Sequence, residues 1–230
     1  MSKQGHLDIA KRPVGRPRAN GRPHLARGAV FKAAAEMIAR FGYAGASLRK
    51  IADELEVSAP SILNMFKTKD QLLNELIVAL ASRTLSFHEA LERENLAPEV
   101  ALYKMIYEEV ISVAGAHELT RLFYLPELRL PGFEVAQAQR ESMVANFKQR
   151  VVQCVDRQVF REVDALLATE QIFQLTETSM IALDVEALGL IDSQALATAD
   201  FVLRGFLVKP GRLVAIRKKA LACAVVPSRE

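Results

Sequence analysis

The chain has 230 residues, half of them hydrophobic and a quarter charged, a composition typical of a soluble globular protein with one large or two modest domains. It has no run of roughly 18 uninterrupted apolar residues, which a membrane-spanning helix requires, and its first residues lack the apolar core of a signal peptide. The two cysteines, Cys154 and Cys223, are too few and too isolated for a disulfide framework or a zinc site. We therefore expect a cytoplasmic protein that uses no metal and no other cofactor.

The positive charge of the chain is concentrated at its start. Residues 1–32 contain eight lysines and arginines and a single acidic residue, Asp8, whereas the whole chain has a net charge of only +3. A basic front on a mildly acidic remainder favours a polyanion as the partner of the front alone. A solubilising tail is the alternative interpretation.

Residues 1–23 are predicted to form a disordered arm, because glycines and prolines interrupt them and few large apolar groups are present. From residue 25 the pattern becomes helical. Apolar residues recur at intervals of four, four and three positions, which indicates an amphipathic helix: Val30, Ala34, Ile38 and Phe41. Gly42 is expected to end this helix, since glycine tolerates the left-handed conformation of a helix C-terminus.

Two short helices are predicted next, and each begins at a serine. Ser47 is expected to cap the first and Ser58 the second, where Pro60 falls in the first turn and its missing N–H costs nothing. The inward face of the first helix is formed by Leu48, Ile51, Ala52 and Leu55, and apolar contacts of the second come from Ile62, Leu63 and Phe66. This layout over residues 47–66 is typical of a helix-turn-helix, whose second helix is free to enter a major groove of DNA.

The rest of the chain is also predicted to be helical. A fourth helix runs from Lys69 to about Leu91. Further helices are expected over residues 98–114, 118–128, 133–160, 165–183 and 193–208. Strand-like alternation between turn signals is absent, so we predict an all-α fold.

The outward face of the second short helix has residues suited to DNA bases. Ala59, Ser61 and Asn64 are small or can form hydrogen bonds, and no bulky charge would keep this helix out of the groove.

Four segments around this motif resemble the DNA-binding head of the TetR/AcrR family: AEMIARFGY at 35–43, ASLRKIA at 46–52, VSAPSIL at 57–63 and FKTKDQLL at 66–73. The resemblance implies a helix-turn-helix head over residues 24–84, a helical regulatory and dimerisation body over 85–210, and a basic tail over 211–230. It also implies a homodimer through the last two body helices, a palindromic double-stranded DNA operator, and a cavity in the body for a small-molecule effector.

Several positions depart from the family pattern. Leu63 and Met65 stand where residues that contact phosphates are usual, and Glu56 stands where glycine is usual, so a left-handed turn there is strained. Arg49 and Lys50 place two cations in the first turn of a helix, against its dipole, which makes sense if a DNA phosphate lies at that end. The residues that we expect at the DNA are Ser47, Arg49, Lys50, Ser58, Ala59, Pro60, Ser61, Asn64 and Lys69.

The arm contains Gly-Arg-Pro twice, at 15–17 and 21–23. The first copy resembles the core of an AT-hook, in which arginine lies in the narrow minor groove, and this adds Arg16 and Arg18 to the residues expected at the DNA. An idle solvated tail is the alternative.

Seven residues of the body lie on helices that line the cavity in the resembled family: Tyr103, Tyr107, Phe123, Met143, Phe147, Phe173 and Thr178. Aromatic residues and methionine at helical spacing are also typical of a plain core. A second set is a candidate for the dimer interface, with intramolecular core as the alternative: Leu183, Ala187, Leu188, Ala195, Ala199, Val202, Leu203 and Phe206.

The favoured function is a homodimeric repressor that a small molecule releases from DNA. An architectural or cell-division DNA-binding protein with the same head and no sensing is the alternative, and activation in place of repression is also open. An enzyme is disfavoured, because the sequence lacks a phosphate-binding loop, a nucleophile elbow and a zinc-spaced cluster.

Overall fold

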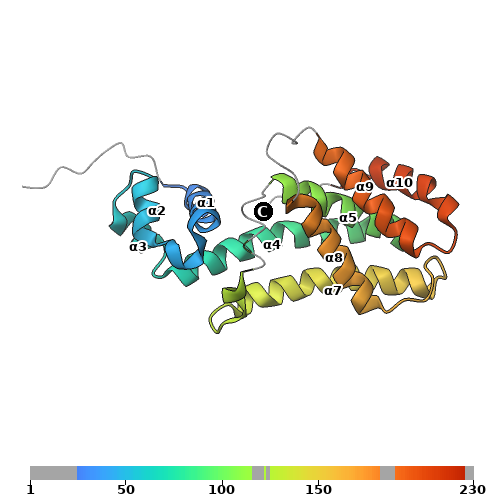
Figure 1. Ribbon diagram of the computed structural model, residues 1–230, viewed down its shortest axis with the longest axis horizontal. Coiled ribbons are helices and arrows are strands. Elements are labelled where there is room, and N and C mark those ends of the chain that lie inside the picture. The colour runs from blue at the N-terminus through green and yellow to red at the C-terminus, as the bar shows by residue number, and fades with distance from the viewer. Residues whose placement is uncertain (1–24, 116–121, 123–124, 182–189, 226–230) are drawn as a thin grey trace, which may run out of the picture.

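The computed structural model describes residues 25–115, 122, 125–181 and 190–225. All regular elements within these ranges are helices, so the all-α prediction is confirmed. The head consists of α1 (Arg27–Gly45), α2 (Leu48–Glu54) and α3 (Ala59–Met65). The body consists of α5 (Pro98–Gly115), η2 (Pro126–Arg129), α7 (Glu134–Asp156), α8 (Ala165–Ile181), α9 (Ile191–Phe206), η4 (Pro210–Arg212) and α10 (Leu213–Ala222). The long helix α4 (Lys69–Arg93) leads from the head into the body (Figure 1).

Where the structure describes the predicted helices, their boundaries agree with it to within a few residues, with the following differences. Gly42 does interrupt α1, with φ of 70°, but a further short turn follows as far as Gly45. The helix predicted over 133–160 ends at Asp156. Residues 118–121, 123 and 124 of the helix predicted over 118–128 lie outside the described residues, and residues 126–129 form the 3-10 helix η2.

The hydrophobic core of the head continues into the body. Ile51, Ala52, Ile62 and Phe66 are completely buried in it, as the helix-turn-helix interpretation requires. The same cluster also includes residues that come between α5 and the second turn of α7: Leu122, Leu128, Phe133 and Ala136. The head is therefore attached to the body by shared side-chain packing as well as by α4.

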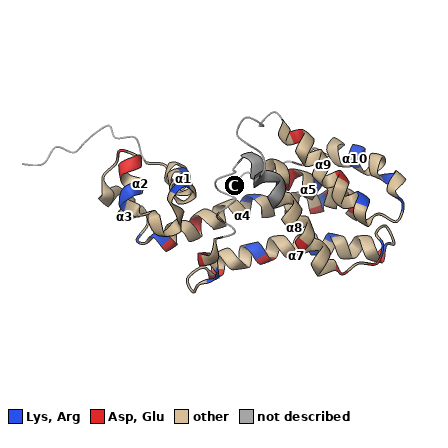
Figure 2. Ribbon diagram, in the orientation of Figure 1, with Lys and Arg blue, Asp and Glu red and all other residues tan. Residues whose placement is uncertain are grey.

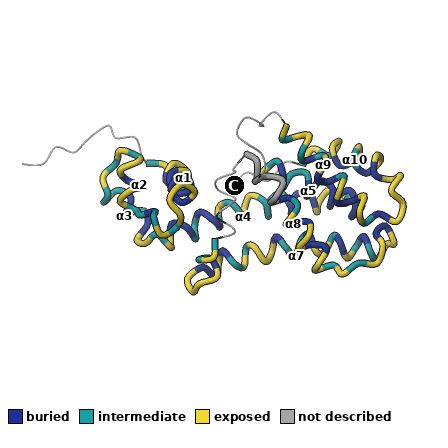
Figure 3. The backbone as a smooth tube through the Cα atoms, in the orientation of Figure 1, coloured by how far each residue is buried: buried dark blue, intermediate teal, exposed yellow. Residues whose placement is uncertain are grey.

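Helix α5 is the centre of the body. Residues 98–106 are all buried, and α5 contacts α7, α8, α9 and α10 (Figure 3). Because helices cover it on several sides, its sequence is apolar nearly all round, as expected of a buried helix.

The basic tail predicted over residues 211–230 contains a helix that packs on the body. Leu213, Ile216 and Ala220 of α10 are buried in the body core. Two arginines of the tail bind body carboxylates: Arg212 pairs with the buried Glu99 at 2.6 Å, and Arg217 pairs with Asp200 at 2.7 Å. Two of the five basic residues of the tail therefore fasten it to the body.

The residues proposed for the dimer interface are largely core residues of the same chain. Ala195, Ala199, Val202 and Leu203 are at most 3% exposed, because this face of α9 packs against α5. The intramolecular alternative therefore holds for these four, while Leu183, Ala187 and Leu188 lie outside the described residues. The opposite face of α9 is solvent-exposed and carries Phe201, which is 68% exposed.

Among the described helices, none has the length and apolar character needed to cross a membrane.

Candidate nucleic-acid interface

The turn between α2 and α3 sets the angle of α3. The Val57 N–H donates to the Ala52 carbonyl at 2.9 Å, and this bond brings the chain back over the end of α2. Glu56 lies in the left-handed region with φ of 53°, as the family pattern predicts for a position where glycine is usual. A side chain in that region costs roughly 1–2 kcal/mol, so the turn is formed at the expense of some local strain.

The outer face of α3 is available to a partner. Asn64 and Pro60 are exposed, Ser61 and Ala59 are half-buried, and Leu63 is 44% exposed on the same side. Ser58 occupies the N-cap position, but its side chain makes no capping hydrogen bond. Its hydroxyl instead pairs with that of Ser61 at 2.8 Å. The predicted N-cap position of Ser58 is therefore confirmed, but the capping hydrogen bond is absent because the two hydroxyls satisfy each other.

Helix α2 begins with a cap and two cations. Ser47 accepts a hydrogen bond from the Lys50 N–H at 3.2 Å, which confirms the predicted cap, and the first turn of α2 has no acidic residue. Figure 2 shows the basic and acidic residues at opposite ends of α2. The Lys50 ammonium donates to the Gly45 carbonyl at 2.8 Å, while Arg49 is exposed. This arrangement places positive charge at a helix N-terminus, where an anion is favoured.

Lys69 joins the start of α4 to the end of α1. Its Nζ donates to the carbonyls of Tyr43 and Ala46, at 2.6 and 3.1 Å, and lies 4.0 Å from the centre of the Tyr43 ring. The Tyr43 hydroxyl in turn donates to Asp70. Burial and the Asp70 carboxylate raise the pKa of Tyr43 above its ordinary value. The sequence predicted Lys69 only as a DNA contact and gave no sign of its contacts with the end of α1.

The comparisons with known proteins agree with this geometry. The family model described as bacterial regulatory proteins, tetR family, matches residues 30–76, which span α1 to the first part of α4. The chain also has the fold of solved structures with TetR-type heads. Three of these are the ketosteroid transcriptional regulator KstR2 of Mycobacterium tuberculosis, the TetR-family regulator PfmR of Thermus thermophilus, and AmtR of Mycobacterium smegmatis.

KstR2 is 17% identical, with a TM-score of 0.74 over 84% of this chain and 100% of the other. PfmR is 21% identical, with a TM-score of 0.67 over 76% and 97%. AmtR is 24% identical, with a TM-score of 0.67 over 92% and 100%.

At these identities the solved structures establish the fold, and the family model adds the sequence pattern of the head. This chain therefore has a head of the tetR family and the fold of TetR-family regulators. Members of the TetR family are transcriptional regulators and not enzymes. The curated proteins include no significant match.

The body of the regulator brings together most of the residues predicted to line a ligand cavity, and packs them tightly. Tyr103, Met143, Phe147 and Phe173 are at most 9% exposed. The rings of Phe147 and Phe173 lie 4.9 Å apart, and Tyr107 is half-buried on α5. A ligand placed among these side chains has to displace packed rings.

Two tyrosine hydroxyls of this set and one histidine make polar contacts in the same region. Tyr103 donates to Asp200 at 2.8 Å and Tyr107 donates to Asp192, so both tyrosines connect α5 to α9. His88 of α4 contacts Phe147 edge-on at 5.4 Å, and its Nδ1 lies 3.2 Å from the Asn146 amide. Burial, reinforced by the charge of Arg150, lowers the pKa of His88 to about 4. The histidine is therefore neutral at physiological pH.

Four predicted site residues fall outside what the structure describes. Arg16, Arg18 and Phe123 lie outside the described residues, and Thr178 lies in α8 but its side chain is not described. Among the described residues, no group of three or more histidine, cysteine, aspartate or glutamate side chains could hold a metal ion.

Proposed function

We propose that this regulator binds a palindromic operator as a homodimer, blocks transcription while bound, and is released by a small-molecule effector. The observation that carries the proposal is the outer face of α3. Its exposed Asn64 and half-buried Ser61 present hydrogen-bonding groups, and Ile62 and Phe66 hold the helix on the head from behind. An amide can form two hydrogen bonds with the edge of adenine, which makes Asn64 the residue best suited to read a base.

The phosphate contacts are assigned to the residues around α3. Arg49 and Lys50 lie at the start of α2 and Lys69 at the start of α4. Lys69 uses two of its three N–H groups on carbonyls of the head, which leaves one for a phosphate. Ser47, Ser58, Ala59 and Pro60 flank these positions, and Arg16 and Arg18 of the arm are assigned to the minor groove. Contacts of this kind position a protein on DNA without reading its sequence.

The homodimer is assigned to the exposed faces of α8 and α9. Along α9, four exposed residues recur at intervals of four positions and so lie on one face: Ser193, Ala197, Phe201 and Gly205. Three of them are small, so another helix can approach closely, and Phe201 supplies apolar area. On α8, Leu166 and Leu167 are about half exposed. A two-fold dimer places two heads on two half-sites of a palindrome, which a single head cannot recognise.

Release by an effector is assigned to the body. The proposed ligand contacts are Tyr103, Tyr107, Phe123, Met143, Phe147, Phe173 and Thr178. Because the head core shares residues with the segment between α5 and α7, a repacking of the body can move the head.

A second candidate is DNA binding without sensing, as in an architectural protein. One observation favours it: the predicted ligand contacts that the structure describes are closely packed. Mapping of bound DNA across the genome separates the two candidates, since a regulator occupies a few promoter sites and an architectural protein many dispersed ones.

Selection of bound sequences from a random DNA library tests the proposal. The wild-type chain is expected to select a two-fold symmetric sequence. Asn64→Ala is expected to lose the preference at one base pair of each half-site, at a cost of about 1–3 kcal/mol per contact. Ser142→Ala, an exposed change on α7 far from α3, serves as the control. An identical selected sequence for Asn64→Ala and wild type would show that Asn64 does not read a base.

A further inference from the structure

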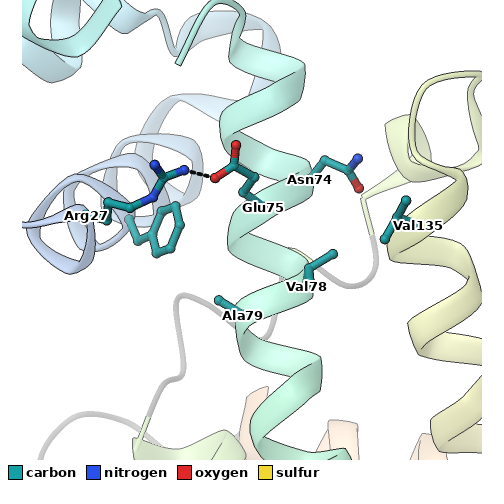
Figure 4. A pocket seen from close by; sticks show the side chains of 7 residues that line it. Arg27, Asn74, Glu75, Val78, Ala79 and Val135 are labelled. Carbon is teal, nitrogen blue, oxygen red and sulfur yellow. Dashed lines mark hydrogen bonds and ion pairs between the residues drawn. The ribbon is translucent and has the colours of Figure 1, made fainter. Parts of the chain in front are cut away.

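A cavity of about 470 Å³ lies where the head meets the body (Figure 4). Its wall combines three helices: Arg27 and Phe31 from α1, Val78 and other residues from α4, and Val135 from the first turn of α7. It is separate from the aromatic cluster of Phe147 and Phe173, and none of the predicted ligand contacts lines it. The volume is within the range of about 300–1,000 Å³ that small-molecule sites occupy.

Most of the wall is apolar. Phe31, Val78, Ala79 and Val135 supply this part of the lining. Val135 is 54% exposed although it is a β-branched apolar residue, and Ala79 is also exposed, so apolar area at this junction remains in contact with water. A ligand that covered these groups would gain roughly 25 cal/mol for each Å² of apolar surface removed from water.

The polar end of the wall has no net charge. Arg27 and Glu75 form an ion pair across it, and the Arg27 guanidinium lies 4.7 Å from the centre of the Phe66 ring (Figure 4). Because Glu75 already neutralises Arg27, a charged ligand would add an unpaired charge, whereas a neutral oxygen can accept from the remaining guanidinium N–H groups.

Asn74 supplies a second polar group on the same wall. Its amide nitrogen donates to the Gly132 carbonyl at 3.4 Å, but its Oδ1 is buried and accepts no hydrogen bond from the described residues. Buried acceptors are nearly always satisfied, so a rotation of the Asn74 amide that let its Oδ1 accept a hydrogen bond from a ligand beside it would be favoured. A hydroxyl group suits either residue, because its oxygen can accept from Arg27 and its O–H can donate to Asn74.

We propose that this junction is a second small-molecule site, for a neutral, mainly apolar molecule that carries a hydroxyl group. Such a molecule contacts the head through α1 and the body through α7 at the same time. Its affinity therefore depends on how the head sits on the body, and by thermodynamic reciprocity its binding changes the affinity for DNA. This last step rests on the proposed function, whereas the site itself does not.

Benzyl alcohol, toluene and benzoate are suitable probes, since the three share a ring and differ only in the hydroxyl and the charge. With ¹³C-labelled valine methyl groups, benzyl alcohol is expected to shift the NMR signals of Val78 and Val135 saturably in the DNA-free protein. Toluene and benzoate should bind several-fold more weakly. Ala79→Phe and Val135→Phe, both at exposed positions of the wall, should abolish the shifts, and Ser142→Phe, an exposed position of α7 outside the wall, should not.

Absence of saturable shifts, or shifts that survive both wall variants, would overturn the site. Benzoate binding as tightly as benzyl alcohol would overturn the assignment of a neutral ligand. Shifts that depend on protein concentration without any probe would identify the cavity as a contact between two copies and would also overturn it.

The coupling is measured separately, by fluorescence anisotropy with a labelled DNA fragment selected by the wild-type chain. Saturating benzyl alcohol is expected to change the Kd for DNA at least about five-fold in wild type and Ser142→Phe, and not in Ala79→Phe. An unchanged Kd in wild type would overturn the coupling. If the chain selected no DNA sequence, the proposed function would fail, while the methyl titration would still decide whether the site exists.

Discussion

Replacing Lys69 with Met tests whether this residue holds the head together in addition to its proposed contact with a DNA phosphate. The change keeps the aliphatic stem but removes two charged hydrogen bonds, to the carbonyls of Tyr43 and Ala46, and the contact with the Tyr43 ring. Hydrogen bonds to a charged group contribute about 1.5–3 kcal/mol each. The two bonds together would then contribute about 3–6 kcal/mol. Because the site is only part-buried and water can reach the freed carbonyls, we take roughly half of this sum, about 1.5–3 kcal/mol. With about 0.5–1 kcal/mol for the ring contact, the loss is about 2–4 kcal/mol.

Thermal unfolding measures this loss. For a chain of this size, each kcal/mol lowers Tm by about 2–4 °C, so Lys69→Met should melt roughly 4–16 °C below wild type at equal protein concentration. Lys67→Met is the matched control, since Lys67 is an exposed lysine of the same turn and its loss changes the net charge equally. Surface substitutions of that kind are usually within about 0.5 kcal/mol of neutral. Equal melting temperatures for the two variants would refute the assignment of Lys69 to the fastening of α1.

Two further changes address stability through pH and through backbone strain. His88 has a pKa of about 4 in the folded chain and its ordinary pKa of 6.5 in the unfolded chain. Between these pH values the unfolded chain binds a proton that the folded chain does not, so the free energy of unfolding falls as pH is lowered from 6.5 towards 4. At pH 5 the loss of stability is about 1–2 kcal/mol relative to pH 7. Urea unfolding of His88→Gln should lack this part of the pH dependence. An equal pH dependence in both proteins would contradict the assignment of the effect to His88. Glu56→Gly should raise stability by up to about 1 kcal/mol: it relieves the left-handed strain at φ of 53°, and the added freedom of the unfolded chain offsets part of this gain. A clear loss of stability in urea unfolding would mean that the contacts of the Glu56 side chain contribute more than the strain costs.

The head was predictable from sequence because its signals are local. The spacing of apolar residues, the serine before α2 and the proline in α3 act within one or two turns, and the three head helices and the start of α4 were placed from such signals. The contacts of Lys69 could not be predicted in this way. Its two carbonyl partners are 26 and 23 residues away along the chain, and no periodicity marks a lysine whose partners are backbone atoms.

The body was predictable as helices but not in the use of their faces. An apolar stripe on α9 predicts that Ala199 and Leu203 are buried, but it does not say whether the same chain or a second copy buries them. Likewise, Phe147 and Phe173 have the same spacing whether they line a cavity or fill a core. The junction cavity was missed because residues from α1, α4 and α7 meet only after the chain has folded.

The core shared by the head and the segment before α7 bears on the construction of chimeric regulators. Grafting the head of this chain onto another body at the end of residue 84 would leave the positions of Leu122, Leu128, Phe133 and Ala136 unfilled, and apolar surface of the head would be exposed. A graft that also transfers residues 122–136 carries its own interface, including the Asn74 contact with Gly132. The transplantable unit of this protein is therefore discontinuous along the chain.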